Sequence, residues 1–184
     1  MKKRIALLLV LALCLFACAK KEEPKPAVTA AANPFFVAWT TPFGTPPFPE
    51  IKEADYMPAF KEGIAQETKE VEAIANSQEA PTFANTVEAL DRSGDLLTKV
   101  NNVFFALTEA NTNEELQKLE NEVAPLLAKH QDDIVLNNKL YQRVKAVWDE
   151  KDKLNLTPEQ ARLLYKAYRY FIRNGAALDE TKKA

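Results

Sequence analysis

Apolar residues recur every three or four positions from residue 55 onward, which is the period of an amphipathic α-helix. Turn formers and polar capping residues divide this region into five expected helices. These begin near Asp55, Thr82 or Asn85, Asn113, Asn137 and Thr157. Helices joined by short loops in this way are typical of an all-α bundle. The sequence therefore predicts an all-α fold, a helical bundle of about five helices, over residues 55–184.

Local signals mark the ends of the first and last of these helices. Asp55 is expected to cap the first helix, with Pro58 tolerated in its first turn. Thr157 and Gln160 have the spacing of a capping box. Gly175 is a suitable residue to end the last helix, because glycine readily adopts the left-handed conformation found there.

The same period predicts which side chains face the core. We expect the second helix to be one long element, in which Gly94 is a weak point or marks a close crossing of helices. We expect Pro125 to kink the third. The expected inward residues are, helix by helix, Met57, Phe60, Ile64, Val71 and Ile74; Val87, Leu90, Leu97, Val100, Phe104 and Leu107; Leu116, Leu119, Val123, Leu126, Leu127 and Ile134; Leu140, Val144, Val147 and Trp148; and Leu163, Leu164, Tyr168, Phe171 and Ile172.

The stretch before the helices combines prolines with aromatic residues. Its aromatic residues are Phe35, Phe36, Trp39, Phe43 and Phe48. Solvated linkers seldom carry so many, so residues 33–54 are interpreted as an extended strap packed across a hydrophobic surface. The alternative is an exposed docking peptide for a partner.

The N-terminus has the pattern of an export signal. Three basic residues precede an apolar run from Ile5 to Ala17, which is too short to span a bilayer. The run ends in Leu15-Phe16-Ala17-Cys18, which resembles a bacterial lipobox. We therefore interpret residues 1–17 as a lipoprotein signal peptide, Cys18 as the lipidated residue, and residues 18–32 as a flexible tether. Ala19 after the cysteine predicts anchoring in the outer membrane, facing the periplasm.

Charge and composition exclude several functions. Without residues 1–17 the chain has 21 basic and 26 acidic residues, so its formal charge is −5. We therefore expect no binding to nucleic acid, and contact with a membrane only through the acyl chains on Cys18. With one histidine, His130, and two serines, the chain cannot supply a His-rich metal centre, and a Ser-His-Asp triad is not expected. His130 lies on an apolar stripe and is interpreted as a packed or capping side chain. No catalytic or metal-binding residue is assigned, and none is assigned to substrate binding.

Two further groups of residues carry polar or charged side chains without a clear catalytic pattern. Neighbouring carboxylates, namely Glu67/Glu70, Glu114/Glu115 and Asp132/Asp133, are interpreted as solvated surface charge. The last helix also carries aromatic and basic residues that could line a groove for an anionic or peptide ligand. The interpretation preferred from sequence places Tyr168 and Phe171 in the core and the basic residues in solvent. The residues of this second group are Arg162, Tyr165, Tyr168, Arg169, Tyr170, Phe171 and Arg173.

A series of short motifs follows in order from Asn33. They are Asn33-Pro34, the run WTTPFGTPPF from Trp39 to Phe48, Pro58-Ala59-Phe60, the run PTFANTVEAL from Pro81 to Leu90, Ala110-Asn111-Thr112, Ala124-Pro125-Leu126 with His130, Leu136-Asn137, and the run RNGAAL from Arg173 to Leu178. This series resembles the start of bacterial peptidyl-dipeptidases of the thimet-oligopeptidase-like zinc metallopeptidase family. The resemblance implies a helical N-terminal region that helps to wall a channel for oligopeptides.

The resemblance also implies what this chain lacks. Members of that family are several times longer and carry H-E-x-x-H, in which two histidines bind zinc and the glutamate activates water. No such motif occurs in the 184 residues, so no zinc ligand or catalytic residue can be assigned here. We expect the N-terminal part of a secreted enzyme from a truncated or split gene, inactive alone and ending inside a helix, with the missing C-terminal region as a partner. The alternative is a stand-alone helical lipoprotein that binds peptides or a partner enzyme.

Overall fold

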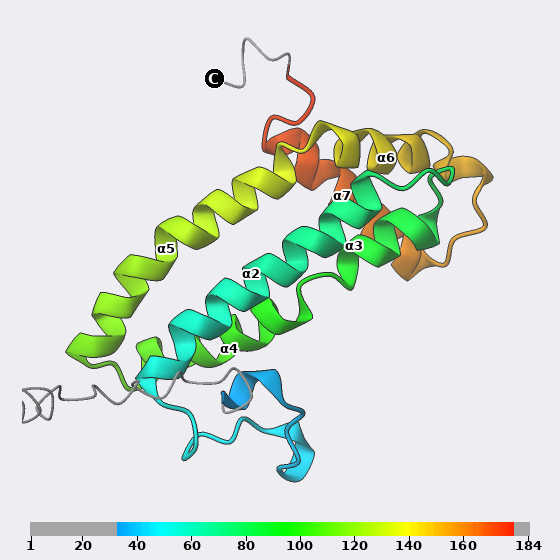
Figure 1. The fold of residues 1–184 in the computed structure, drawn as a ribbon. Helices are drawn as coiled ribbons and strands as arrows, with labels where there is room; N and C mark the ends of the chain where they lie inside the picture. The colour runs from blue at the N-terminus through cyan, green and yellow to red at the C-terminus, as the bar shows by residue number, and fades with distance from the viewer. Residues whose placement is uncertain (1–32, 179–184) are drawn as a thin grey trace, which may run out of the picture. The chain divides into compact units, whose positions relative to one another are not determined.

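The computed structural model describes residues 33–178, and all of its regular elements are helical (Figure 1). The α-helices are α2 (Glu53–Ala75), α3 (Ala89–Asp91), α4 (Asp95–Ala110), α5 (Glu114–Val135), α6 (Asn138–Asp149) and α7 (Pro158–Arg173). The 3₁₀ turns are η3 (Pro34–Phe36), η4 (Pro42–Gly44) and η6 (Lys151–Lys153), and η5 (Phe83–Glu88) is a π-helix. The predicted all-α bundle is confirmed. Between residues 33 and 178, no helix is both long and apolar enough to cross a membrane.

Helix α2 is the centre of the bundle. It packs against α4, α5 and α6, and Figure 1 shows it running between α5 and α4. Gly63 lies where α2 crosses α4, because a Cβ atom there would come within 2.9 Å of the Leu97 Cα atom. The absence of a side chain at this position lets the two helix backbones approach closely.

The apolar side chains form three groups within the described residues. The first joins the N-terminal half of α2 to α4, the start of α5 and the strap, and includes Tyr56, Phe60 and Phe104. The second joins the C-terminal half of α2 to α6 and α7. The third lies between η5, α6 and α7 around Leu164. Helix α2 therefore contributes to two groups, and α7 contributes to two.

Several predicted helix ends are confirmed. The side chains of Asn113 and Asn137 accept hydrogen bonds from the first turns of α5 and α6, and Thr157 and Gln160 form the capping box of α7. At the end of α7, Gly175 adopts φ 84°, the Gly175 amide donates to the Ile172 carbonyl at 3.2 Å, and the Ala176 amide donates to the Phe171 carbonyl at 3.0 Å. This pair of bonds is a Schellman motif.

The predicted N-cap of the first helix, Asp55, is wrong by three positions. Helix α2 begins at Glu53 after an N-cap at Lys52. Asp55 is the third helical residue, where its carboxylate accepts a hydrogen bond from the Lys52 amide at 2.8 Å. This is the hydrogen bond that the third helical residue makes in a capping box. An acidic residue is common both there and at the N-cap, so the sequence alone does not distinguish the two positions. Pro58 consequently lies inside α2, and the region before the helix ends at Lys52.

The predicted long second helix is also wrong, because the chain is divided into η5, α3 and α4. The break is at Gly94, which adopts φ 76° immediately before α4. A Cβ atom at Gly94 would lie 2.6 Å from the Glu67 Cδ atom, so the chain passes close to α2 at this point. The expectation that Gly94 weakens this helix is confirmed, because its left-handed conformation separates α3 from α4, whereas the close approach of two helix backbones is at Gly63.

The strap is less extended than predicted, because it contains the two turns η3 and η4. Its first part packs as expected. Phe35 is buried, and the Lys99 ammonium donates to the Phe35 and Val37 carbonyls and lies 4.1 Å from the centre of the Trp39 ring. Its later part does not pack, since Phe43 is fully exposed and Phe48 is half exposed. The packed strap is therefore confirmed for the first part of this segment, and the later part is exposed, while its docking to a partner stays a prediction.

The prediction that Leu126 faces the core is wrong. Leu126, expected to face inward, is 37% exposed, because it lies at the edge of the α5 stripe while Leu127 packs on the core.

Arg143 of α6 is buried and holds the loop before η5. Its guanidinium donates to the Ser77 and Glu79 carbonyls and to the side-chain oxygens of Asn85 and Thr86, at 2.9–3.3 Å. The expected signal peptide, Cys18, the tether and residues 179–184 lie outside the described residues.

We predict that Gly94→Ala destabilises the fold by about 2–3 kcal/mol. An alanine in the left-handed conformation costs about 1–2 kcal/mol. Its Cβ atom would also push the Glu67 carboxylate away from the His130 Nε2 atom, which lies 2.9 Å from the Glu67 Oε2 atom. Gly44→Ala is the matched control, because Gly44 has φ 66° but no atom within 4 Å of its Cβ position. Urea denaturation followed by circular dichroism measures both. Equal losses in the two variants would contradict a specific role for the contact with Glu67.

We also predict a loss of stability in alkaline solution. Burial, with help from Glu53 and Asp55, raises the pKa of Tyr56 from 10.0 to about 12. The unfolded chain therefore loses the phenolic proton first as pH rises above 10, and the folded state loses up to about 2–3 kcal/mol by pH 12.

The variant Tyr56→Phe isolates this effect. The Tyr56 hydroxyl has no hydrogen-bond partner among the described residues, so the variant should match the wild-type chain at pH 7 and be the more stable of the two at pH 11. Denaturant midpoints at the two pH values provide the measurement. A parallel decline in both proteins would rule out this assignment.

Candidate functional site

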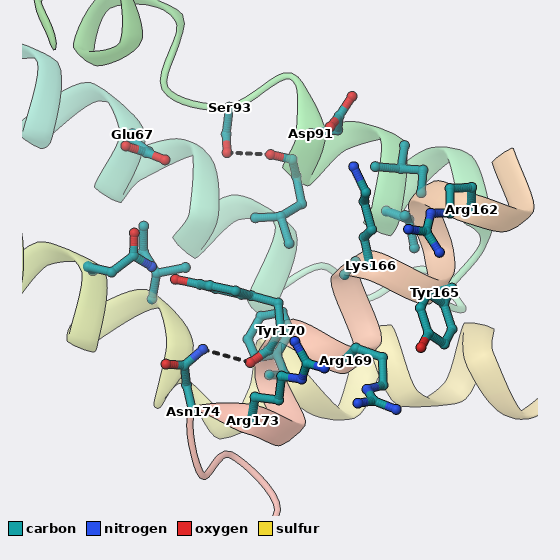
Figure 2. A pocket seen from close by; sticks show the side chains of 17 residues that line it. Glu67, Asp91, Ser93, Arg162, Tyr165, Lys166, Arg169, Tyr170, Arg173 and Asn174 are labelled. Carbon is teal, nitrogen blue, oxygen red and sulfur yellow. Dashed lines mark hydrogen bonds between the residues drawn. The ribbon is translucent and has the colours of Figure 1, made fainter. Parts of the chain in front are cut away.

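A pocket of about 780 Å³ lies between α7 and the elements that face it. One wall is α7, which supplies more of the lining than any other element. The opposite wall comes from Glu67 of α2, from the segment around Leu90 and Ser93, and from Gln131 and Ile134 of α5. Figure 2 shows that the lining side chains come from elements that are far apart in the sequence.

The α7 wall carries a row of four basic residues. They are Arg162, Lys166, Arg169 and Arg173, which we call the α7 stripe. Spacings of four, three and four residues place them on one face of the helix. Among residues 33–178, no carboxylate lies within 4.0 Å of any of them, although seven other ion pairs are present there.

Two tyrosines lie beside the α7 stripe. The guanidinium carbons of Arg162 and Arg169 lie 5.3 and 5.6 Å from the centre of the Tyr165 ring, which is cation–π distance. Burial, together with the charge of Asp132, raises the pKa of Tyr170 above its usual value. A phenolic hydroxyl can donate one hydrogen bond.

The opposite wall is acidic but sparsely so. Asp91 and Glu67 are its two carboxylates, and Figure 2 shows Lys166 extending from α7 toward Asp91. The Ser93 hydroxyl donates to the Leu90 carbonyl at 2.7 Å, so its proton already has an acceptor. Ser93 therefore has a structural role at the turn before α4.

His130 is buried between α2 and α5. Its Nε2 atom lies 2.9 Å from the Glu67 Oε2 atom, and its Nδ1 atom lies 3.5 Å from the Thr68 hydroxyl oxygen. Both ring nitrogens therefore have polar partners from α2, and the interpretation of His130 as a packed side chain agrees with its position.

The interpretation as solvated charge is wrong for Glu67, whereas Glu70 is exposed as expected. The Glu67 side chain is only 18% exposed and contacts His130, while the Glu70 carboxylate accepts a hydrogen bond from the Gly94 amide at 2.9 Å. These contacts were not foreseen because they join residues that are far apart in the sequence. They place two negative charges near the N-terminus of α4, where the helix dipole favours them.

The described residues do not fit a catalytic zinc ion. Such a site takes about three protein ligands, commonly including two histidines. Residues 33–178 contain no group of three histidine, cysteine or acidic side chains placed to hold a metal ion, and the single histidine is engaged with Glu67 and Thr68. We therefore derive no zinc-dependent step from the residues of this chain.

The chain matches a known family over the region that forms most of the helices. Residues 60–183 match the N-terminal domain of neurolysin and thimet oligopeptidase. The chain belongs to the thimet oligopeptidase family. The match covers all the helices from within α2 to the end of α7, so the resemblance found from the short motifs is confirmed.

The chain is similar to bacterial members of the family over most of its length. The chain is 44% identical over 152 residues to the dipeptidyl carboxypeptidase of Escherichia coli (strain K12), which covers 83% of this chain and 22% of that protein. It is 44% identical over 154 residues to the dipeptidyl carboxypeptidase of Salmonella typhimurium, covering 84% and 23%. The thimet-like oligopeptidase of Dictyostelium discoideum is 31% identical over 116 residues, covering 61% of this chain and 17% of that protein.

The chain therefore spans about a fifth of the length of these relatives. Residues 60–183 correspond to the N-terminal domain of that family, and all the residues that line the pocket lie within this domain.

Part of one wall of the pocket could be predicted from the sequence. Arg162, Tyr165, Arg169, Tyr170 and Arg173 all line it, as the groove alternative expected, while Tyr168 stacks on Trp148 outside it. The sequence reasoning missed Lys166, whose position four residues after Arg162 and three before Arg169 was the available signal. It also missed the facing residues, which the order of the chain does not bring together.

Proposed function

We propose that this chain is the non-catalytic N-terminal domain of an exported zinc metallopeptidase that releases dipeptides from the C-terminus of oligopeptides. Its partner would be a catalytic region carrying the zinc-binding motif, and the chain alone would be inactive. The observation that carries the proposal is the 44% identity to two dipeptidyl carboxypeptidases over more than four fifths of this chain.

The arrangement of the domain supports this role. The 184 residues contain no H-E-x-x-H, and the one histidine is buried against Glu67. The domain offers instead a pocket lined by charged and aromatic side chains, which suits contact with peptides more than bond cleavage. In the proposed enzyme, this domain helps to admit and orient oligopeptides, while the catalytic region supplies the zinc ion.

A chimeric enzyme tests the proposal. The region of the E. coli dipeptidyl carboxypeptidase that matches this chain is replaced by the corresponding residues of this chain. Because the helices and their caps should fold in the same way, we expect the chimera to retain dipeptide release within about tenfold in kcat/KM, a cost of about 1.4 kcal/mol.

Two controls accompany the chimera. The same enzyme with the matched region deleted should lose activity, and this chain alone should release no dipeptide in the presence of zinc. An inactive chimera that is folded and contains zinc would contradict the proposal. Full activity of the deleted enzyme would also contradict it and would favour a stand-alone module.

We also propose that the chain is lipid-anchored through Cys18 to the outer membrane and faces the periplasm. The basic start, the short apolar run and the lipobox-like ending at Cys18 support this location. Several acyl chains on one residue would hold the protein firmly, whereas one chain binds a membrane only weakly.

Replacement of the anchoring residue tests the location. In a Gram-negative host, we expect the wild-type chain in the outer-membrane fraction and Cys18→Ser in the soluble periplasmic fraction or retained as the uncleaved precursor. Cys14→Ser is the matched control and should remain with the membrane. Membrane fractionation of both variants provides the measurement, and identical behaviour of wild type and Cys18→Ser would contradict lipidation at Cys18.

A further inference from the structure

The length of the α7 stripe suits a ligand with several negative charges. Arg162 and Arg173 are eleven residues apart, which corresponds to about 16 Å along a helix. Alternate side chains of an extended peptide are about 7 Å apart. Three acidic side chains on one face of such a peptide therefore span nearly the same distance as the stripe.

The cations of the α7 stripe are available to such a ligand. Arg162, Lys166 and Arg173 are exposed and Arg169 is half-buried. None of the four has a carboxylate within 4.0 Å among the described residues, whereas Lys118, Lys129 and Lys145 each pair with an acidic residue one turn away.

Aromatic side chains hold part of the α7 stripe in place. The Tyr165 ring contacts the guanidinium groups of Arg162 and Arg169, so these two side chains lose less freedom when a ligand binds. A guanidinium group can donate two parallel hydrogen bonds to one carboxylate, which an ammonium group cannot.

The facing wall distinguishes a peptide from a nucleic acid. Asp91 and Glu67 would repel the continuous charge of a phosphate backbone, and the chain as a whole is acidic. The same carboxylates can accept hydrogen bonds from the amide groups of a peptide. The pocket therefore has donors for acidic side chains on one wall and acceptors for a peptide backbone on the other.

We propose that the α7 pocket binds acidic peptide segments, whose side-chain carboxylates lie along Arg162, Lys166, Arg169 and Arg173. The peptide nature of the ligand rests on the proposed function, whereas its acidic character rests on the α7 stripe itself. In the full enzyme, this site would favour oligopeptides that carry acidic residues.

Direct binding to the purified chain tests the inference. The probe is hexaglutamate with an amidated C-terminus and an uncharged fluorophore at its N-terminus, and fluorescence anisotropy measures its binding. We expect saturable binding that weakens severalfold between 20 and 300 mM salt, because exposed charges are screened. Hexaglutamine with a free C-terminus should bind at least tenfold more weakly, since it carries a single carboxylate.

Two double variants with the same change in net charge locate the site. Arg162→Gln/Arg169→Gln should weaken hexaglutamate binding about tenfold. Lys118→Gln/Lys129→Gln removes two exposed lysines of α5 and should change the affinity by less than about twofold. If thermal melting shows that the arginine variant does not fold, Lys166→Gln/Arg173→Gln takes its place with the same expected loss.

Three results would overturn the inference. The first is an equal effect of the α7 and α5 variants, which would indicate non-specific charge attraction. The second is hexaglutamine binding as tightly as hexaglutamate. The third is tighter binding of a single-stranded oligothymidylate of matched charge, which would indicate a nucleic-acid site. An active chimera without hexaglutamate binding would refute this site alone, and an inactive chimera with such binding would refute the proposed function alone.

Discussion

The close passage of the chain at Gly94 against α2 is the constraint on which the arrangement of the other helices depends. Here the chain turns into α4 within contact distance of Glu67, and the Gly94 amide donates to Glu70. Glu67 in turn contacts His130 of α5. One turn of α2 therefore fixes both of the helices that flank it, and Gly63 permits the close approach of α4 one turn earlier.

Much of the fold could be predicted from the sequence, because the signals concerned are local. A cap such as Asn113 or Thr157 acts on amides two or three residues away, and the apolar period is set by the geometry of the helix itself. The errors arose where distant contacts override local preference. Gly94 ends a helix because α2 lies beside it, and Arg143 holds a loop more than fifty residues away.

The candidate site could likewise be predicted only where its residues are close together in the sequence. The residues of α7 share one helix face, so their spacing identified most of one wall. Glu67 and Asp91 come from other helices, and their place in the pocket depends on how α2 and α3 pack. A sequence can therefore indicate which side chains share a face, whereas the wall they meet follows only from the tertiary structure.

The division of the apolar core into three groups has a consequence for how the domain opens. Helices α6 and α7 bury their side chains mainly with each other, with η5 and with the end of α2, while the strap and α4 belong to the first group. Such groups can open as separate cooperative units in hydrogen exchange. The pocket lies where two of these units meet, because Leu90 and Phe171 of its lining belong to the second group and Val87 and Leu163 belong to the third. A ligand held there would join the two units, so its binding energy would appear as slower exchange of the α7 amides.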